Sequence, residues 1–202
     1  MKIQKTLSVL AIASAFASIA SAQQHKFEID AKTFGYRNVA SIESVADFET
    51  FTGKTNGVTG YIAFNSKTKV GSGKIVVDPK SIDTGIPLRN EHMQSAGWLD
   101  TTKYPEIVFE AAKVQAIKGN DYKVTGSFTL HGVTKKITVP VTVRYSAAGP
   151  ANKAAGFEGD IVRLTTKFNI VLADYGITIP QMAAGKVAKD VTISLSTYAI
   201  SK

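Results

Sequence analysis

Residues 122–144 read YKVTGSFTLHGVTKKITVPVTVR, and apolar and polar side chains alternate along most of this stretch. A period of two is typical of a β-strand that has one face against a core and the other in water. A turn signal, His131-Gly132, interrupts the alternation near its middle. We therefore expect two antiparallel strands here, joined by a short turn.

The same alternation recurs along the rest of the chain. It is clear in residues 191–196, and noisier stretches cover residues 26–30, 33–40, 58–64, 70–78, 106–110 and 156–163. About eight or nine one-sided strands of this kind must bury their apolar faces against each other. A closed barrel does so and also removes exposed strand edges, whereas a sandwich only buries the faces. The pattern therefore indicates an all-β fold and favours the barrel only modestly.

Residues 86–97 break the alternation and contain good helix formers. Asp83 or Thr84 can open a helical turn, and Gly97 can close it. We expect one short helical segment over about residues 86–97 and a further turn near residues 181–184. No internal repeat or low-complexity linker interrupts the chain, which favours a single domain.

Composition narrows the class of protein. The chain has 202 residues, of which 44% are hydrophobic and 20% charged, and this excludes a disordered or collagen-like chain. The lack of cysteine excludes disulfides, thiolate metal sites and a cysteine nucleophile. Only three histidines occur, without an HExxH motif, so we expect no metal site. The net charge of +8 comes from scattered lysines, whereas a nucleic-acid binder gathers them on one face.

The first 22 residues have the pattern of a cleavable secretory signal. Two lysines precede an apolar run, residues 7–19, and Ala20-Ser21-Ala22 follows as a cleavage site with small residues. The run is far shorter than the roughly 20 residues that span a bilayer, which disfavours an uncleaved membrane anchor. We expect residues 1–22 to be removed and residues 23–202 to form one exported domain without stable membrane insertion.

A distinctive set of motifs lies between residues 81 and 109. It runs Ser81-Ile82-Asp83-Thr84, Arg89-Asn90-Glu91-His92-Met93, Ser95, Trp98-Leu99-Asp100, Lys103-Tyr104-Pro105-Glu106-Ile107 and Phe109. Further motifs follow in order: Val124-Thr125-Gly126, Leu130-His131-Gly132-Val133-Thr134-Lys135, Gly156-Phe157, Arg163, Phe168, Gly185 and Asp190-Val191. In order and spacing, these residues resemble the YceI-like polyisoprenoid-binding family over about residues 58–200.

The resemblance implies a lipocalin-like, eight-stranded antiparallel barrel whose apolar cavity holds an isoprenoid chain. It also implies a periplasmic location, as for exported members of the family. The N-terminal strand departs from the family pattern, which usually has an Asp-x-x-His-Ser start and a second histidine. Here Asp30 is followed by Ala31-Lys32-Thr33, and no histidine lies between residues 26 and 91. Whatever those histidines do in other family members, other residues must do it in this chain.

The apolar faces of the expected strands supply most of the candidate lining of the cavity, and Trp98 and Phe168, which lie outside those stretches, complete it. These residues are Tyr61, Phe64, Trp98, Phe109, Val124, Phe128, Leu130, Val139, Val141, Phe157, Phe168 and Ile193. Such residues usually fill a core, and the resemblance rather than the pattern favours a cavity. Gly126 shares a face with Phe128, which either makes room for a ligand or permits the barrel to curve.

Three residues are candidates to contact a polar headgroup: Arg89, His92 and Arg163. Guanidinium and imidazolium groups suit a diphosphate or a quinone oxygen. For Arg89 and His92 we favour a structural role, in which they tie the helical segment to Asp83, Asp100 or strand carbonyls. Arg163 either reaches an acid such as Asp190 or points to the ligand.

A catalytic site is hard to assemble from these motifs. There is no Gly-x-Ser-x-Gly elbow, and Glu91 and His92 point to different sides of a helix. We predict an exported, non-enzymatic protein that binds a polyisoprenoid, a quinone or polyprenyl phosphate, for transport or storage. We expect no cofactor apart from bound lipid and no nucleic-acid partner, and a homodimer remains open. The alternatives are a filled-core stress or interaction protein and an enzyme that uses His92 with Glu91 or Asp100.

Overall fold

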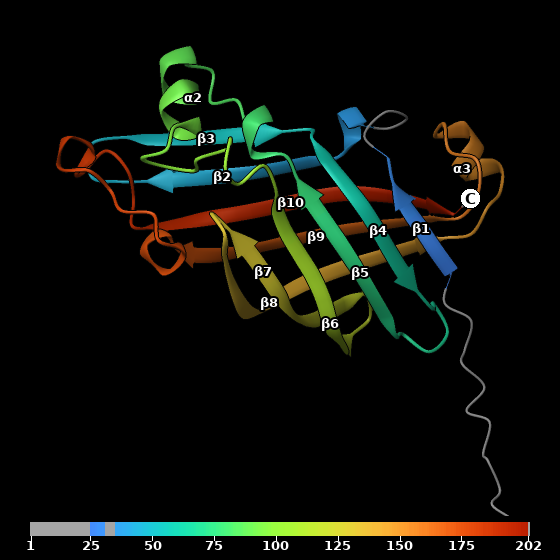
Figure 1. The fold of residues 1–202 in the computed structure, drawn as a ribbon. Coiled ribbons are helices and arrows are strands. Elements are labelled where there is room, and N and C mark those ends of the chain that lie inside the picture. The colour runs from blue at the N-terminus through green and yellow to red at the C-terminus, as the bar shows by residue number, and fades with distance from the viewer. Residues whose placement is uncertain (1–24, 31–34, 202) are drawn as a thin grey trace, which may run out of the picture.

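The computed structural model describes residues 25–30 and 35–201, and the predicted signal segment, residues 1–22, lies outside the described residues. Eight antiparallel strands close into a barrel in the order β1-β4-β5-β6-β7-β8-β9-β10 and back to β1 (Figure 1). Their bounds are β1 (His25–Ile29), β4 (Val58–Phe64), β5 (Gly71–Val77), β6 (Ile107–Lys118), β7 (Asp121–Leu130), β8 (Val133–Ser146), β9 (Ile161–Val171) and β10 (Asp190–Ser201). The expected all-β, eight-stranded antiparallel barrel is confirmed.

A further hairpin, β2 (Val39–Val45) and β3 (Thr50–Thr55), also pairs with β10. The first half of β10 pairs with β2 over residues 192–196, and its end pairs with β1 at Ile200 and Ser201. One long strand therefore carries both the hairpin and the closure of the barrel.

Asn38 fills the place where β10 changes its partner. Its Oδ1 accepts hydrogen bonds from the Tyr198 backbone N–H at 2.8 Å and from Thr197 Oγ1 at 3.0 Å. Asn38 and Thr197 are both fully buried. Because a buried N–H without a partner is costly, this side chain replaces a ladder bond that neither β1 nor β2 provides.

Two expected strands begin later than the alternation suggests. In the described part of residues 33–40, Gly35–Arg37 forms a 3-10 helix (η1) and β2 starts at Val39, so that expectation is wrong. Likewise, residues 156–160 are not strand, and β9 starts at Ile161. Two aromatic rings in the described parts of these stretches, Tyr36 and Phe157, pack against a cation instead of the barrel core: the Arg37 guanidinium lies 5.3 Å from the Tyr36 ring and 4.5 Å from that of Phe157.

The turn between β7 and β8 is the one predicted at His131-Gly132. Both residues have positive φ, 50° and 73°, as a two-residue hairpin turn of type I′ requires. The Tyr104 ring occupies the position that a Cβ of Gly132 would take. His131 Nδ1 lies 3.1 Å from the Tyr175 carbonyl oxygen, so this histidine ties the turn to the segment after β9.

The two α-helices of the described chain lie toward opposite ends of the molecule (Figure 1). The predicted helical segment is α2 (Pro87–Gln94), and η4 (Gln181–Ala183) is the expected turn near residues 181–184. Helix α3 (Pro150–Ala154), beside the C-terminus, was not expected, because its Gly-Pro start reads as a turn. In the described chain, no helix is long and apolar enough to cross a membrane.

Candidate functional site: an apolar cavity inside the barrel

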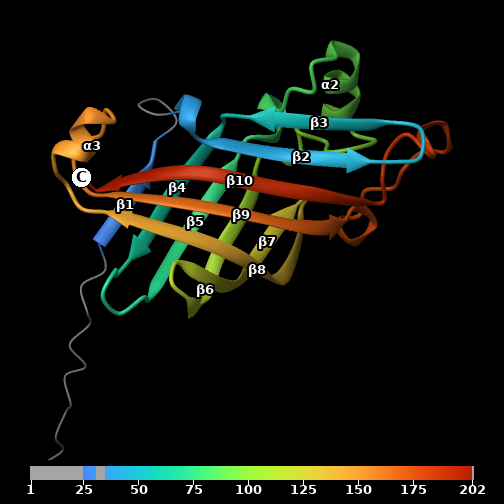
Figure 2. The same cartoon turned by 180° about the vertical axis from the view of Figure 1, so that it is seen from behind.

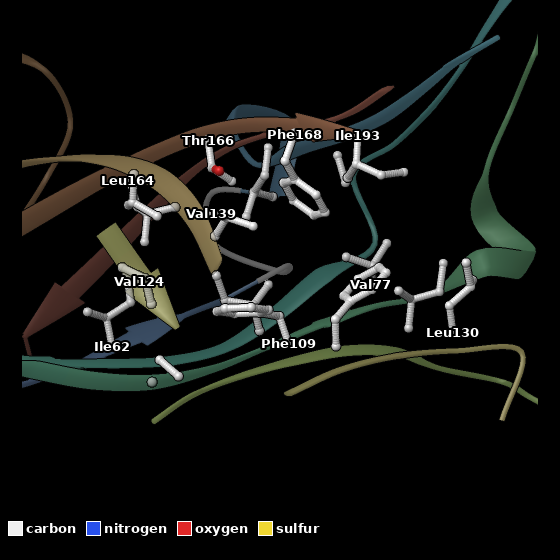
Figure 3. Close-up of a pocket in the computed structure, with 18 of the residues that line it drawn as sticks. Ile62, Val77, Phe109, Val124, Leu130, Val139, Leu164, Thr166, Phe168 and Ile193 are labelled. Atoms are coloured by element: carbon white, nitrogen blue, oxygen red, sulfur yellow. The ribbon is translucent and has the colours of Figure 1, made fainter. Parts of the chain in front are cut away.

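The interior of the barrel contains a cavity of about 150 Å³, measured as the space that the centre of a water molecule can reach. Every strand from β2 to β10 contributes to its wall. Figure 3 shows Ile62 and Val124 on one side, and Leu164 and Phe168 on the other, all directed into the space between them. The alternation seen in the sequence therefore places one face of each strand around a common hollow.

A row of small side chains runs across one side of the wall. Gly73 on β5 pairs with Ala111 on β6, which pairs with Gly126 on β7. At Gly126 a Cβ would come within 2.8 Å of the Phe109 ring, so this glycine accommodates close packing and does not itself line the cavity. Gly73 and Ala111 do line it. A Cβ at Gly73 would come within 2.8 Å of the Tyr61 carbonyl oxygen, so the space in this row lies beside the small side chain of Ala111.

Aromatic rings pack at both ends of the cavity. Phe128 meets Phe168 edge-to-face at a centroid distance of 5.7 Å and meets the buried Tyr175 at 5.5 Å. At the other end, Phe64 meets the buried Tyr122 at 6.1 Å. Burial raises the pKa of both tyrosines, because an apolar environment disfavours the phenolate. Both ends are therefore lined by uncharged, close-packed rings.

The few polar groups in the wall are hydroxyls, and two of them already have partners. Thr55 Oγ1 lies 2.5 Å from Ser81 Oγ, and Thr166 Oγ1 donates to the Pro140 carbonyl oxygen at 2.6 Å. No charged side chain lines the cavity, and the described residues contain no cluster of acids and histidines that could hold a metal ion. The cavity offers an apolar molecule a dry surface but presents no acid or base to act on it.

Ten of the candidate lining residues lie in this wall: Tyr61, Phe64, Phe109, Val124, Phe128, Leu130, Val139, Val141, Phe168 and Ile193. Trp98 and Phe157 do not. Trp98 packs, half-buried, at the edge of the cluster around Tyr175. Phe157 is buried against Tyr198, with the two rings stacked at 5.5 Å.

Several wall residues were not among the candidates. Leu164 and Leu195 continue the alternation that contains Phe168 and Ile193, so extending the period of two would have found them. Ile82 and Leu99 belong to the segment between β5 and β6, and no local period places them inside the barrel.

The headgroup candidates lie away from the cavity wall. Arg89 forms an ion pair with Glu49, and its guanidinium lies 4.6 Å from the Phe51 ring, so it ties α2 to the β2–β3 hairpin. This is the structural role that we favoured, although with a different acid. His92 is exposed on α2. Arg163 lies exposed on the outer face of β9, with its guanidinium 5.5 Å from the Tyr198 ring.

Residues 78–106, which we call the cap segment, cover one side of the cavity. Ile82 and Leu99 are its contributions to the wall, whereas α2 itself buries no residue. Asn90 holds the segment together: it accepts from the Thr84 N–H at 2.9 Å and donates to Asp83 Oδ1 at 2.7 Å. Donation from Asn90, with a second bond from the Gly85 N–H, lowers the pKa of Asp83 below its ordinary value. The cap segment is thus attached through the buried Ile82 and Leu99, the partly buried Met93 and Trp98, and a set of polar contacts.

A closed antiparallel barrel with an apolar hollow is the architecture of lipocalin-like proteins, in which the interior can hold one small ligand. Residues 22–199 match the YceI-like domain, and the chain belongs to this family.

Curated relatives cover almost the same length. A UPF0312 protein of Vibrio parahaemolyticus is 31% identical over 87% of this chain and 90% of its own. Another, from Pseudomonas paraeruginosa, is 29% identical over 98% of both chains.

Solved structures share the fold at low identity. BcnA of Burkholderia cenocepacia superposes with a TM-score of 0.71 at 22% identity, over 85% of this chain and 99% of its own. A polyisoprenoid binding domain from Saccharophagus degradans, implicated in plant cell wall breakdown, gives a TM-score of 0.61 at 18% identity over 89% and 99% of the two chains.

Proposed function

We propose that this protein is an exported, non-enzymatic binding protein that holds a polyisoprenoid lipid inside its barrel, for transport or storage. The observation that carries the proposal is the cavity wall, which is apolar, contains no charged side chain and receives residues from nine strands. Family membership and the polyisoprenoid-binding domain of Saccharophagus degradans support the same ligand class. The signal pattern in residues 1–22 supports export, and we propose the periplasm as the location.

An isoprenoid tail suits this cavity energetically. Each buried methylene contributes about 0.8 kcal/mol, so one five-carbon unit contributes up to roughly 4 kcal/mol before the costs of binding. Because the wall presents no charge, the tail supplies the affinity, and either a quinone or a polyprenyl phosphate headgroup is compatible with it.

The size of the cavity indicates how a long tail enters. A dry cavity of about 150 Å³ is enough for a molecule such as benzene, and hence for roughly one isoprene unit. A longer tail needs more room, and the cap segment is a part of the wall that is not strand and whose helix α2 buries none of its residues. We propose that the cap segment moves outward when the lipid enters.

Mass spectrometry of organic extracts tests this function directly. The full chain is expressed with its own signal segment in a Gram-negative host, purified without detergent and extracted. We expect a stoichiometric isoprenoid whose mass identifies its headgroup. An extract without isoprenoid, still empty after incubation with quinones and polyprenyl phosphates, would contradict the proposal.

The small cavity volume also favours one alternative, a barrel that is nearly filled by its own side chains and acts through its surface. Hydrogen exchange of the cap segment separates the two functions. Added lipid should change exchange in the cap segment if the barrel binds it, because the segment moves when the lipid enters, and should change nothing if the core is already complete.

A further inference from the structure

Two arginines face each other on the outside of the barrel, on the side seen in Figure 2. Val143 on β8 and Leu164 on β9 point into the cavity, so the neighbouring Arg144 and Arg163 point outward. Arg144 and Arg163 are directly opposed in the antiparallel register, and both are exposed. The Cβ atoms of such a pair lie about 4.5–5.5 Å apart, which brings two positive side chains together.

No carboxylate compensates this pair within the described chain. Like charges in directly opposed positions destabilise a sheet. Among the described residues, neither guanidinium forms an ion pair. Two acids in the neighbouring strand positions are held by hydroxyls and not by the arginines: Asp121 accepts from Thr142 Oγ1 at 2.8 Å, and Asp160 accepts from Tyr145 Oη at 2.7 Å. The two arginines therefore form a site with two guanidinium groups that are not ion-paired in the part of the chain that the structure describes.

The surroundings of the pair form a shallow hollow. Its walls are Arg144, Arg163 and a second opposed pair, Thr142 and Thr165. Arg163 is held in place because its guanidinium lies over the Tyr198 ring, which in turn stacks on the buried Phe157. A side chain that is already ordered loses less entropy when it binds a partner.

We propose that this hollow binds a phosphate group. The guanidinium fork matches the oxygens of phosphate and can bind them in pairs. A phosphate monoester carries a charge of about −1.5 to −2 at neutral pH, which balances two arginines, whereas a single carboxylate balances only one. The Thr165 hydroxyl at the rim can add a further hydrogen bond, whereas the Thr142 hydroxyl already donates to Asp121. The site lies on the outer face and is independent of the lipid proposed for the cavity.

Thermal unfolding in phosphate tests the site on the full chain. At equal ionic strength, we expect sodium phosphate to raise the unfolding temperature of the wild type by about 3 °C more than sodium chloride does. Arg144→Gln and Arg163→Gln should each abolish this difference. Lys167→Gln is the matched control, because Lys167 is an exposed cation on the same face of β9 whose partner on β10 is a serine, Ser194. An equal loss in the control, or no phosphate effect in the wild type, would overturn the proposal.

Arg144→Gln also gives a readout that needs no ligand. Without phosphate and at low salt, removal of one charge should leave the protein as stable as the wild type or more stable, since it relieves repulsion. If Arg144→Gln instead lowers the unfolding temperature by several degrees in chloride, the arginines stabilise the fold as they stand and the proposal fails.

The phosphate can be a free ion or part of a lipid headgroup, and two binding assays distinguish these sources. Calorimetry measures inorganic phosphate, and sedimentation measures binding to phosphatidylcholine vesicles with and without phosphatidic acid, whose headgroup is a phosphate monoester. Calorimetric binding without sedimentation indicates a free phosphate. Sedimentation that requires phosphatidic acid and both arginines, but not Lys167, indicates a headgroup. Failure of both assays would refute the site.

Discussion

At the scale of single residues, the cavity depends on where the wall carries small side chains. Ala111 on β6 is paired with a glycine on each neighbouring strand, Gly73 on β5 and Gly126 on β7. A larger side chain at this position would enter empty space, because Ala111 lines the hollow.

Ala111→Leu should fill part of the cavity. We expect the bound isoprenoid to fall several-fold, while the free energy of unfolding changes by less than about 1 kcal/mol, because the added methyl groups meet space instead of packed atoms. Lipid extraction and urea unfolding measure the two effects. Ala112→Leu is the control, since Ala112 is the exposed next residue on β6. Unchanged lipid content in Ala111→Leu would argue against the cavity as the binding site.

Asp83 gives a prediction for low pH. Hydrogen bonds from Asn90 and Gly85 to its carboxylate lower its pKa below the ordinary value of 3.8. This stabilisation is present above pH 3.8 and is lost as the pH falls through the lowered pKa. Carbon-13 NMR of the Asp83 carboxyl group should give a midpoint below 3.8, and Asn90→Ala should raise it. An equal midpoint in both proteins would mean that Asn90 does not hold the carboxylate.

At the scale of elements, α2 is a helix held by contacts at its surface. It buries none of its residues, and Arg89 joins it to Glu49 and Phe51 of the hairpin. Helices without a buried apolar face depend on such contacts, because their own propensity is marginal at this length.

Arg89→Gln should loosen the cap segment without unfolding the barrel. An ion pair of this exposure is worth up to about 1 kcal/mol, so amide hydrogen exchange in α2 should rise by up to about fivefold. Lipid content should change little, while lipid exchange should become faster. Glu91→Gln serves as the control because Glu91 is exposed on the same helix. Equal hydrogen exchange of α2 in the wild type and in Arg89→Gln would show that the ion pair between Arg89 and Glu49 is not needed to hold the helix.

At the scale of the whole molecule, barrel closure depends on β10 and its two partners. Asn38 provides the hydrogen bonds where β10 passes from β2 to β1. Its side chain is fully buried, so water cannot replace it without rearrangement.

Asn38→Ala should therefore destabilise the entire barrel. We expect a loss of about 1–3 kcal/mol, because the Tyr198 N–H and the Thr197 hydroxyl lose their acceptor. Urea unfolding measures this loss as a shift of the midpoint. Thr129→Ala is a matched control: it removes one exposed hydroxyl pair with Thr134 and should change stability by less than about 0.5 kcal/mol. If Asn38→Ala lowers the free energy of unfolding by no more than this control does, the junction between β10, β1 and β2 tolerates an unpaired N–H.

Much of the barrel could be predicted because its determinants are local. The alternation from Tyr122 to Leu130 specifies which side chains share a face, and the His131-Gly132 turn specifies how β7 meets β8. Most of the candidate wall residues come from such stretches. Trp98 shows the limit, since a ring next to Leu99 in the sequence packs outside the cavity while Leu99 lines it.

The sequence by itself determined most of the barrel strands, the short helix, the hairpin turn and the family, because each depends on residues that are close together along the chain. Only the tertiary structure decided which strands β10 joins, how Ile82 and Leu99 complete the wall, and that Arg144 lies opposite Arg163. These features depend on pairings between distant segments. Period-two patterns are nearly alike in every strand, so they determine the face of a side chain but not its neighbour on the next strand.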